Sequence, residues 1–215
     1  TIVSNGASIQ NEGLIKEISG GSYTYNPTIF QEGALQNSGT INDITNNAKF
    51  SGAPAIKNEG SGKITITDAE VHGTVDGLTA GFAIYGYAVL PSATGMVTIN
   101  GGNYSCTVYN PNNTSATEKL FPDDATGIVI NSGNFEHSPS ANLLAPNKAI
   151  VNSGITDFPY AVGKQDYTVT YELDGGTNNV ANPVSYNSSV GIPELKTPVK
   201  ADYAFLGWTM NEGTD

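Results

Sequence analysis

Two short patterns of apolar and polar positions alternate along residues 1–160. The first pattern is a small residue, an aliphatic residue, any residue, Asn, any residue and Gly. It occurs at residues 8–13, 34–39, 55–60 and 149–154. The second pattern is an Ile, then small polar residues or Gly, then an aromatic or β-branched residue. It begins at Ile18, Ile44, Ile66, Ile99 and Ile130.

The spacing of the second pattern predicts a solenoid. Successive Ile positions are 26, 22, 33 and 31 residues apart. Irregular periods of this size, made of short strands and Asn/Gly turns, are typical of stacked coils with inserted loops. Asn and Gly adopt the positive φ that tight corners need. Because no long helical pattern separates the strands, we predict a parallel β-helix with one coil per repeat.

Stacking of the coils predicts three internal rows, because equivalent residues of neighbouring coils lie about 4.8 Å apart. We expect one buried column of the five Ile residues. A second column would consist of Tyr23, Phe50, Val71, Tyr104 and Phe135. A ladder of amide side chains at a turn would consist of Asn11, Asn37 and Asn58, with Asn152 as a further candidate.

Two segments break the repeat and are predicted to protrude as loops. They are residues 87–94, between the halves of the fourth repeat, and residues 107–124, before the fifth Ile. Loops on a rigid scaffold are common binding sites. The candidate binding residues in this region are Asn110, Asn112, Asn113 and Phe121. Residues 156–165 are expected to form a last coil or a cap.

The last fifty residues have a different pattern. A strand that alternates from Tyr167 to Glu172 runs into Asp174-Gly-Gly, and proline-spaced segments lead to the block from Tyr203 to Trp208. This stretch resembles the Listeria–Bacteroides repeat, or internalin B-repeat, a small β-grasp-like module of bacterial surface proteins. The resemblance covers residues 167–215 and implies an extracellular location at the bacterial cell surface. The family pattern normally continues with one or two more strands, so we expect an incomplete module.

The repeats of residues 1–160 resemble the right-handed parallel β-helix of the pectin-lyase-like superfamily, and the rung repeats of bacterial surface proteins. The predicted fold class is therefore all-β, a right-handed parallel β-helix solenoid plus a small C-terminal β-grasp-like module. The predicted domains are residues 1–164 and residues 165–215. The abundance of Ile, Val, Thr and Tyr agrees with a fold made of strands.

The charge and the cysteine content exclude some classes of binding partner and an internal disulfide. The net charge is −11, and all nine basic residues are lysine. Nucleic-acid binding depends on basic stripes rich in Arg, and anionic membranes attract basic segments, so we expect neither partner. Cys106 is the only cysteine, which leaves no partner for an internal disulfide. A small buried apolar residue is the preferred interpretation of Cys106, with a reactive or cross-linking thiol as the alternative.

Two groups of residues are candidates for chemistry. Asp123 and Asp124 are the candidate catalytic carboxylates, although neighbouring strand residues point to opposite faces. Asp68, Glu70 and His72 are the candidate metal ligands, because alternate strand residues share a face. A solvated surface is the simpler interpretation of both groups. We expect no cofactor; calcium would suit the carboxylates, but no other feature of the sequence supports it.

The sequence therefore predicts a non-catalytic bacterial cell-surface protein, in which a solenoid adhesion or stalk segment is linked to a B-repeat spacer. The expected partners are host or cell-wall glycans or surface proteins. Two alternatives stay open: a carbohydrate-binding module, and a β-helix polysaccharide lyase or glycoside hydrolase. An exposed row of aromatic residues would favour the first alternative, and a carboxylate cluster on neighbouring coils would favour the second.

Overall fold

The computed structural model describes residues 2–4, 7–25, 33–76, 87–109, 119–122, 124–187 and 193–209. Contacts between Cα atoms divide the chain into two compact units, Thr1–Gly163 and Lys164–Asp215. The fold is all-β, as predicted, and the one helix among the described residues is the short 3-10 turn η1 (Ala141–Leu143). No described helix is long and apolar enough to cross a membrane.

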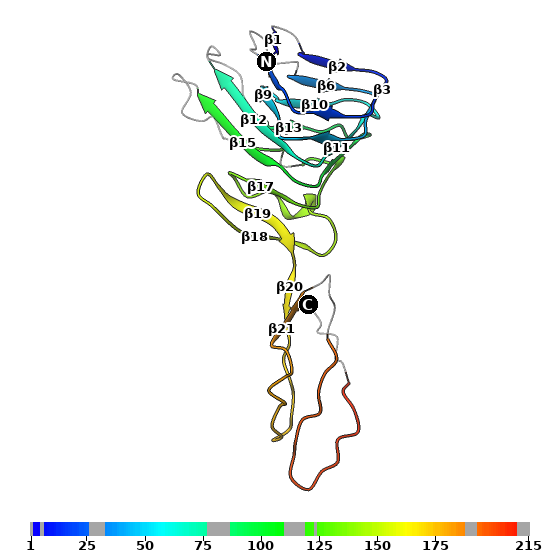
Figure 1. Ribbon diagram of the computed structural model, residues 1–215, viewed down its shortest axis with the longest axis vertical. Coiled ribbons are helices and arrows are strands. Elements are labelled where there is room, and N and C mark those ends of the chain that lie inside the picture. The colour runs from blue at the N-terminus through cyan, green and yellow to red at the C-terminus, as the bar shows by residue number, and fades with distance from the viewer. Residues whose placement is uncertain are drawn as a thin grey trace. The chain divides into compact units, whose positions relative to one another are not determined.

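Unit 1 contains three parallel sheets, called here sheet 1, sheet 2 and sheet 3 (Figure 1). Sheet 1 consists of β2 (Ile9–Asn11), β6 (Leu35–Asn37), β10 (Ile56–Asn58) and β13 (Val89–Leu90). Sheet 2 consists of β3 (Leu14–Ile15), β7 (Thr40–Ile41), β11 (Lys63–Ile66), β14 (Met96–Ile99) and β16 (Ile128–Ile130). The parallel strands of sheet 3 are β1 (Ile2–Ser4), β5 (Ser22–Tyr25), β9 (Ala48–Gly52), β12 (Ala69–Asp76), β15 (Asn103–Tyr109) and β17 (Gly133–Phe135).

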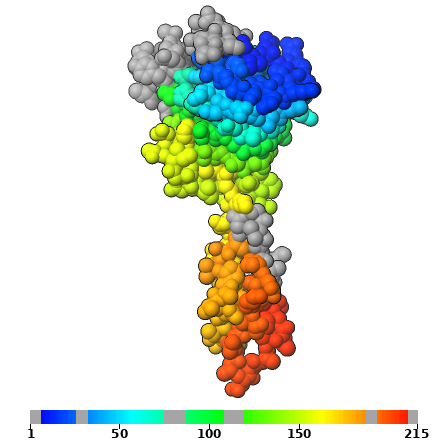
Figure 2. Space-filling view, in the orientation of Figure 1, coloured from blue at the N-terminus to red at the C-terminus, as the bar shows by residue number. Residues whose placement is uncertain are grey.

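The chain adds strands to sheets 1, 2 and 3 in that order on each of four successive repeats, and the fifth repeat adds β16 and β17 to sheets 2 and 3, which is the arrangement of a β-solenoid. A small extra pair, β4 (Ile18–Ser19) and β8 (Ile44–Thr45), joins the first two coils between sheets 2 and 3. Figure 2 shows the stacking as successive bands of blue, cyan and green across unit 1. The handedness of the coil and the pectin-lyase-like relationship stay predictions.

The two predicted apolar columns are confirmed. Ile18 pairs with Ile44, and Ile66 pairs with Ile99, which pairs in turn with Ile130. The amides of Thr67 and Asp68 donate to the Ile44 carbonyl and connect these two runs. All five Ile side chains are buried. Burying an aliphatic side chain of this size contributes about 1.5–3 kcal/mol, so the column is a main source of stability.

The second column is in register across all five coils. The aligned residues are Tyr23, Phe50, Val71, Tyr104 and Phe135. Tyr23 stacks on Phe50 with ring centroids 5.1 Å apart, and Tyr104 stacks on Phe135 at 5.2 Å. All of them except the partly buried Tyr23 are buried. Alternate residues of sheet 3 therefore fill the interior, and the residues between them face outward.

The predicted amide ladder is confirmed for three coils. The Nδ2 of Asn11 donates to Asn37 Oδ1 at 2.7 Å, and the Nδ2 of Asn37 donates to Asn58 Oδ1 at 2.8 Å. The Nδ2 of Asn58 donates to the Gly62 carbonyl at 2.7 Å. All three Asn residues are buried, so the ladder satisfies polar groups at the corner between sheets 1 and 2. The register of β10 and β13 places Pro91 opposite Asn58, and the ladder ends there because proline has no amide side chain.

The prediction that Asn152 extends the ladder is wrong. Residues 149–154 do not begin a new coil, because they lie in β18 (Lys148–Ile155), which is joined to β19 (Phe158–Lys164) by a two-residue turn. Asn152 is exposed, and its Oδ1 accepts a hydrogen bond from the Gly154 amide at 2.8 Å. β19 pairs antiparallel with β17 and covers the edge of sheet 3. Residues 158–164 thus cap this edge, which agrees with the predicted cap.

The predicted loop at residues 87–94 is wrong for Val89 and Leu90, which form β13, whereas residues 91–94 lie in a turn. Val89 pairs with Ile56, and Ala88 and Val89 are buried, so this segment continues sheet 1. The Asn/Gly signature is missing here, but a small residue followed by an aliphatic one is sufficient to fill the interior. Of the second predicted loop, Thr107–Tyr109 belong to β15, and the Val89 amide donates to the Leu120 carbonyl of the fifth coil at 3.2 Å. Residues 110–118 lie outside the described residues.

Unit 2 has little regular structure among its described residues. β20 (Asp166–Thr168) pairs antiparallel with β21 (Ser185–Asn187), and the rings of Tyr167 and Tyr186 stack at 5.2 Å. An isolated bridge joins Thr177 and Val199. The β-grasp-like architecture and the independent folding of the two predicted domains stay predictions.

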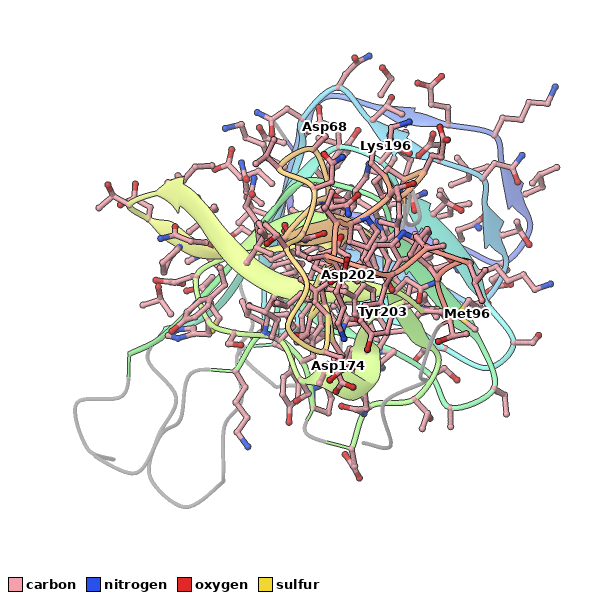
Figure 3. The ribbon with its side chains drawn as sticks, turned by 90° about the horizontal axis from the view of Figure 1, so that it is seen from below. Asp68, Met96, Asp174, Lys196, Asp202 and Tyr203 are labelled. Atoms are coloured by element: carbon pink, nitrogen blue, oxygen red, sulfur yellow. The ribbon has the colours of Figure 1, made fainter. Side chains whose placement is uncertain are left out.

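A charged contact links two turns of unit 2. Lys200 Nζ lies 2.9 Å from Asp174 Oδ2 and 4.3 Å from the centroid of the Tyr203 ring. The hydrogen bond from Lys200 lowers the pKa of the exposed Asp174 carboxyl below its usual value. Asp174 and Tyr203 are labelled in Figure 3. Asp174 and Gly175 both have positive φ, and Asp174-Gly-Gly forms a turn.

Candidate functional site

The outward face of sheet 3 carries the charged candidates of unit 1. Because inward and outward residues alternate, this face has two polar rows along the coils. The first row is Ser22, Lys49, Glu70, Asn103 and Asn134. The second row is Thr24, Ser51, His72 and Ser105. The face is a polar surface of hydroxyl, amide and charged groups.

Side chains within these rows bond to their neighbours on the next coil. Lys49 Nζ forms an ion pair with Glu70 Oε2, and Asn134 Nδ2 donates to Asn103 Oδ1 at 2.9 Å. His72 Nδ1 and Ser105 Oγ are hydrogen-bonded at 2.7 Å. The exposed ion pair between Lys49 and Glu70 contributes little free energy, about 0–1 kcal/mol. In each of these three pairs, both side chains are bonded to a side chain of the adjacent coil.

The predicted metal ligands do not converge. Glu70 and His72 share the outward face, as predicted, but they bond to Lys49 and Ser105 respectively. Asp68 lies in the turn before β12, where its Oδ2 accepts a hydrogen bond from the backbone amide of Asn47 at 2.8 Å. The three side chains therefore have separate partners, and the structure does not bring them together as a cation site.

The predicted carboxylate pair and binding loop are only partly within the described residues. Asp124 is exposed in a turn, whereas Asp123, Asn110, Asn112 and Asn113 lie outside the described residues.

The assignment of Phe121 to a binding loop is wrong. Its side chain is buried, with ring centroids 6.3 Å from Tyr104 and 6.2 Å from Phe135. It fills the interior of the solenoid beside the last aromatic pair, and the sequence gives it a loop-like setting only because polar residues precede it.

Burial also removes Tyr104 from acid–base chemistry near neutral pH. Its side chain is fully buried, and its hydroxyl donates to the Gly101 carbonyl at 3.0 Å. Burial, with a smaller contribution from the charge of Asp68, raises the pKa of Tyr104 well above its usual value. Tyr104 is therefore a structural residue.

One cluster of potential metal ligands was not predicted from the sequence. Within the part of the chain that the structure describes, one group of at least three His, Cys, Asp or Glu residues has its ligand atoms within 4.8 Å of one another. The group is Cys106, Glu136 and His137. A signal was present: Tyr104 pairs with Phe135, and in the sequence Cys106 follows Tyr104 by two residues as His137 follows Phe135. The repeat pattern ends at the aromatic residue and does not include these positions.

Unit 2 contains an open groove of about 1180 Å³ lined by aromatic residues. Trp208 packs against Tyr171 and Phe205, with ring centroids 5.4 and 5.2 Å away. Tyr203 also lines the groove, and it is 70% exposed. Trp208 is thus half-buried, whereas Phe205 and Tyr203 are open to solvent.

The comparisons with known proteins concern unit 2. A family profile of the Listeria-Bacteroides repeat domain matches residues 167–215. No curated protein and no solved structure matches the chain. The second unit is thus similar to a repeat that occurs in bacterial surface proteins, which agrees with the repeated, β-rich organisation of the chain.

Proposed function

We propose that the chain is a non-catalytic part of a bacterial cell-surface protein, with the solenoid as an adhesion or stalk segment and the second unit as a B-repeat spacer. The match of residues 167–215 to the Listeria-Bacteroides repeat supports the surface location. The observation that carries the non-catalytic role is the outward face of sheet 3. Its ionic and imidazole groups bond to neighbours on adjacent coils.

Glycoside hydrolysis normally needs two carboxyl groups on either side of the scissile bond, about 5–5.5 Å apart in retaining enzymes and 6.5–9.5 Å apart in inverting ones. Glu70 on the outward face is paired with Lys49, and Asp68 in the turn before β12 accepts a hydrogen bond from the backbone amide of Asn47. Groups held in this way support the coil stack. The expected partners are host or cell-wall glycans or surface proteins, contacted without turnover.

A carbohydrate-binding module is the second candidate. The observation that favours it is the row of Asn, Ser and His side chains on sheet 3, together with the partly exposed aromatic residues of the groove in unit 2. Amides and hydroxyls donate and accept hydrogen bonds with sugar hydroxyls, and aromatic rings stack on sugar faces. Binding without turnover would distinguish this candidate from an enzyme.

The test uses the intact chain on a glycan array and in product assays with polygalacturonate and common host glycans. We expect no released product. Turnover that disappears in Asp123→Asn or Asp124→Asn would overturn the non-catalytic role. Glycan binding that is lost in Asn103→Ala and retained in Asn152→Ala would favour the carbohydrate-binding candidate, because Asn152 is exposed outside the row.

A further inference from the structure

The end of sheet 3 brings Cys106, Glu136 and His137 together. β15 extends to Tyr109, but its neighbour β17 ends at Phe135. Beyond Phe135 the backbone no longer follows β15 as a strand. The carboxylate of Glu136 instead accepts the Cys106 amide at 3.0 Å. This bond holds the Glu136 carboxylate beside the cysteine.

The ligand atoms of the three side chains are close. The Cys106 sulfur, a Glu136 oxygen and a His137 ring nitrogen all lie within 4.8 Å of one another. His137 Nε2 is 4.0 Å from Glu136 Oε2 and is buried from solvent. Cys106 is buried, while Glu136 and His137 are half-buried. The cluster thus lies at the boundary between the core and the surface, where an ion has access and is partly shielded from water.

We propose that Cys106, Glu136 and His137 bind one divalent transition-metal ion of the zinc type, with water as the fourth ligand. Thiolate, imidazole and carboxylate are the three protein ligands that Zn²⁺ uses, and the thiolate selects against calcium and magnesium. On binding, the Cys106 thiol loses its proton to solvent as the metal–sulfur bond forms. No oxidation or reduction takes part.

The geometry needs only a small adjustment. Bonds of about 2.0–2.3 Å around a tetrahedral ion place the ligand atoms roughly 3.5 Å apart. Ligand atoms up to 4.8 Å apart must therefore approach by about 1 Å, which rotations of the Glu136 and His137 side chains supply. The ion would cross-link the fourth coil to the segment that follows the fifth.

Cobalt substitution of the intact chain tests the site directly, because a thiolate bound to Co²⁺ gives a charge-transfer absorption band. We expect one equivalent of Co²⁺ to produce this band and Zn²⁺ to displace it. Cys106→Ser and His137→Gln should abolish the band. His72→Gln is the matched control and should retain it, because His72 lies on the outward face of the same sheet, bonded to Ser105.

Two further measurements test the site even if the Cys106 and His137 variants do not fold. Glu136→Gln keeps an oxygen that can accept the Cys106 amide but removes the charge, and it should weaken Co²⁺ binding at least tenfold. In the wild type, Zn²⁺ should slow alkylation of Cys106 at least tenfold. The proposal is wrong if Co²⁺ gives no thiolate band, if Cys106→Ser leaves metal affinity unchanged, if His72→Gln abolishes the band in a folded protein, or if Zn²⁺ does not protect the thiol.

Discussion

Tyr104 and Phe135 lie directly opposite each other in β15 and β17, with ring centroids 5.2 Å apart and ring planes inclined by 17°. The pair shows that the inner register is kept up to the fifth coil. Phe121 packs against both rings and fills the space beside them. Just beyond this pair, where β17 has ended, Cys106 lies close to Glu136 and His137. The aromatic pair therefore lies next to both the end of the core and the proposed metal site.

Truncation of Ile99 to Ala should destabilise unit 1 by about 2–5 kcal/mol, the range for large-to-small changes in a packed core. Ile99 is fully buried between Ile66 and Ile130. Met96, labelled in Figure 3, provides a control on the same strand. Its side chain is 40% exposed. Met96→Ala should change stability by about 0.5 kcal/mol or less. Denaturant unfolding measures both, and equal losses in the two variants would contradict the column.

Replacement of Asn37 by Ala should cost about 1–3 kcal/mol, because it removes the amide between Asn11 and Asn58 and leaves buried polar groups without their partner. Thermal or denaturant unfolding gives the loss. Asn152→Ala is the control and should have little effect, since Asn152 is exposed. The ladder would have no structural role if both variants unfolded like the wild type.

Glu59 should make unit 1 less stable in acid. Hydrogen bonds from Lys57 and Gln36 lower the pKa of Glu59 below 4.5, its ordinary value. The unfolded chain therefore takes up this proton first as the pH falls. The stabilisation is present above about pH 4.5 and is lost as the pH falls through the folded-state pKa. Stability profiles of the wild type and Glu59→Gln should converge in acid; parallel profiles would contradict this coupling.

The inner columns and the ladder could be predicted from the sequence because they depend on residue type at repeated positions. Ile at the start of each repeat and an aromatic or β-branched residue after it need only a common coil length to align. Gly and Asn mark the corners between them. The repeat pattern gave a wrong prediction at residues 149–154. The residue types there match the repeat, but the segment lies in β18, which forms a hairpin with β19. A short motif does not determine the strand with which its residues pair.

The sites were harder to predict because their geometry depends on where strands end. Glu136 reaches the Cys106 amide only because β17 is shorter than β15, a difference that no residue pattern gives. Asp68, Glu70 and His72 share a spacing typical of a common face, but their partners come from neighbouring coils. Phe121 follows a polar segment, and only the fold shows that its ring enters the core.

In the proposed role as a stalk or adhesion segment, the solenoid must stay folded. We expect the second unit to unfold locally at a lower free energy than the solenoid. The inner columns of unit 1 are almost completely buried, whereas Val180, Val184 and Leu206 of unit 2 are largely exposed. Unit 2 also has a single strand pair and one isolated bridge among its described residues. Few buried apolar contacts imply a low free energy of local opening.

Hydrogen exchange of the intact chain tests this account most directly. The account predicts that amides of β11, β12, β14 and β15 exchange only through the openings with the highest free energy. Amides of residues 164–209 should exchange through openings of distinctly lower free energy. It also predicts that Ile99→Ala speeds exchange in unit 1 and leaves unit 2 unchanged. Uniform protection across both units, or faster exchange in the coils than in unit 2, would contradict a rigid solenoid joined to a weaker module.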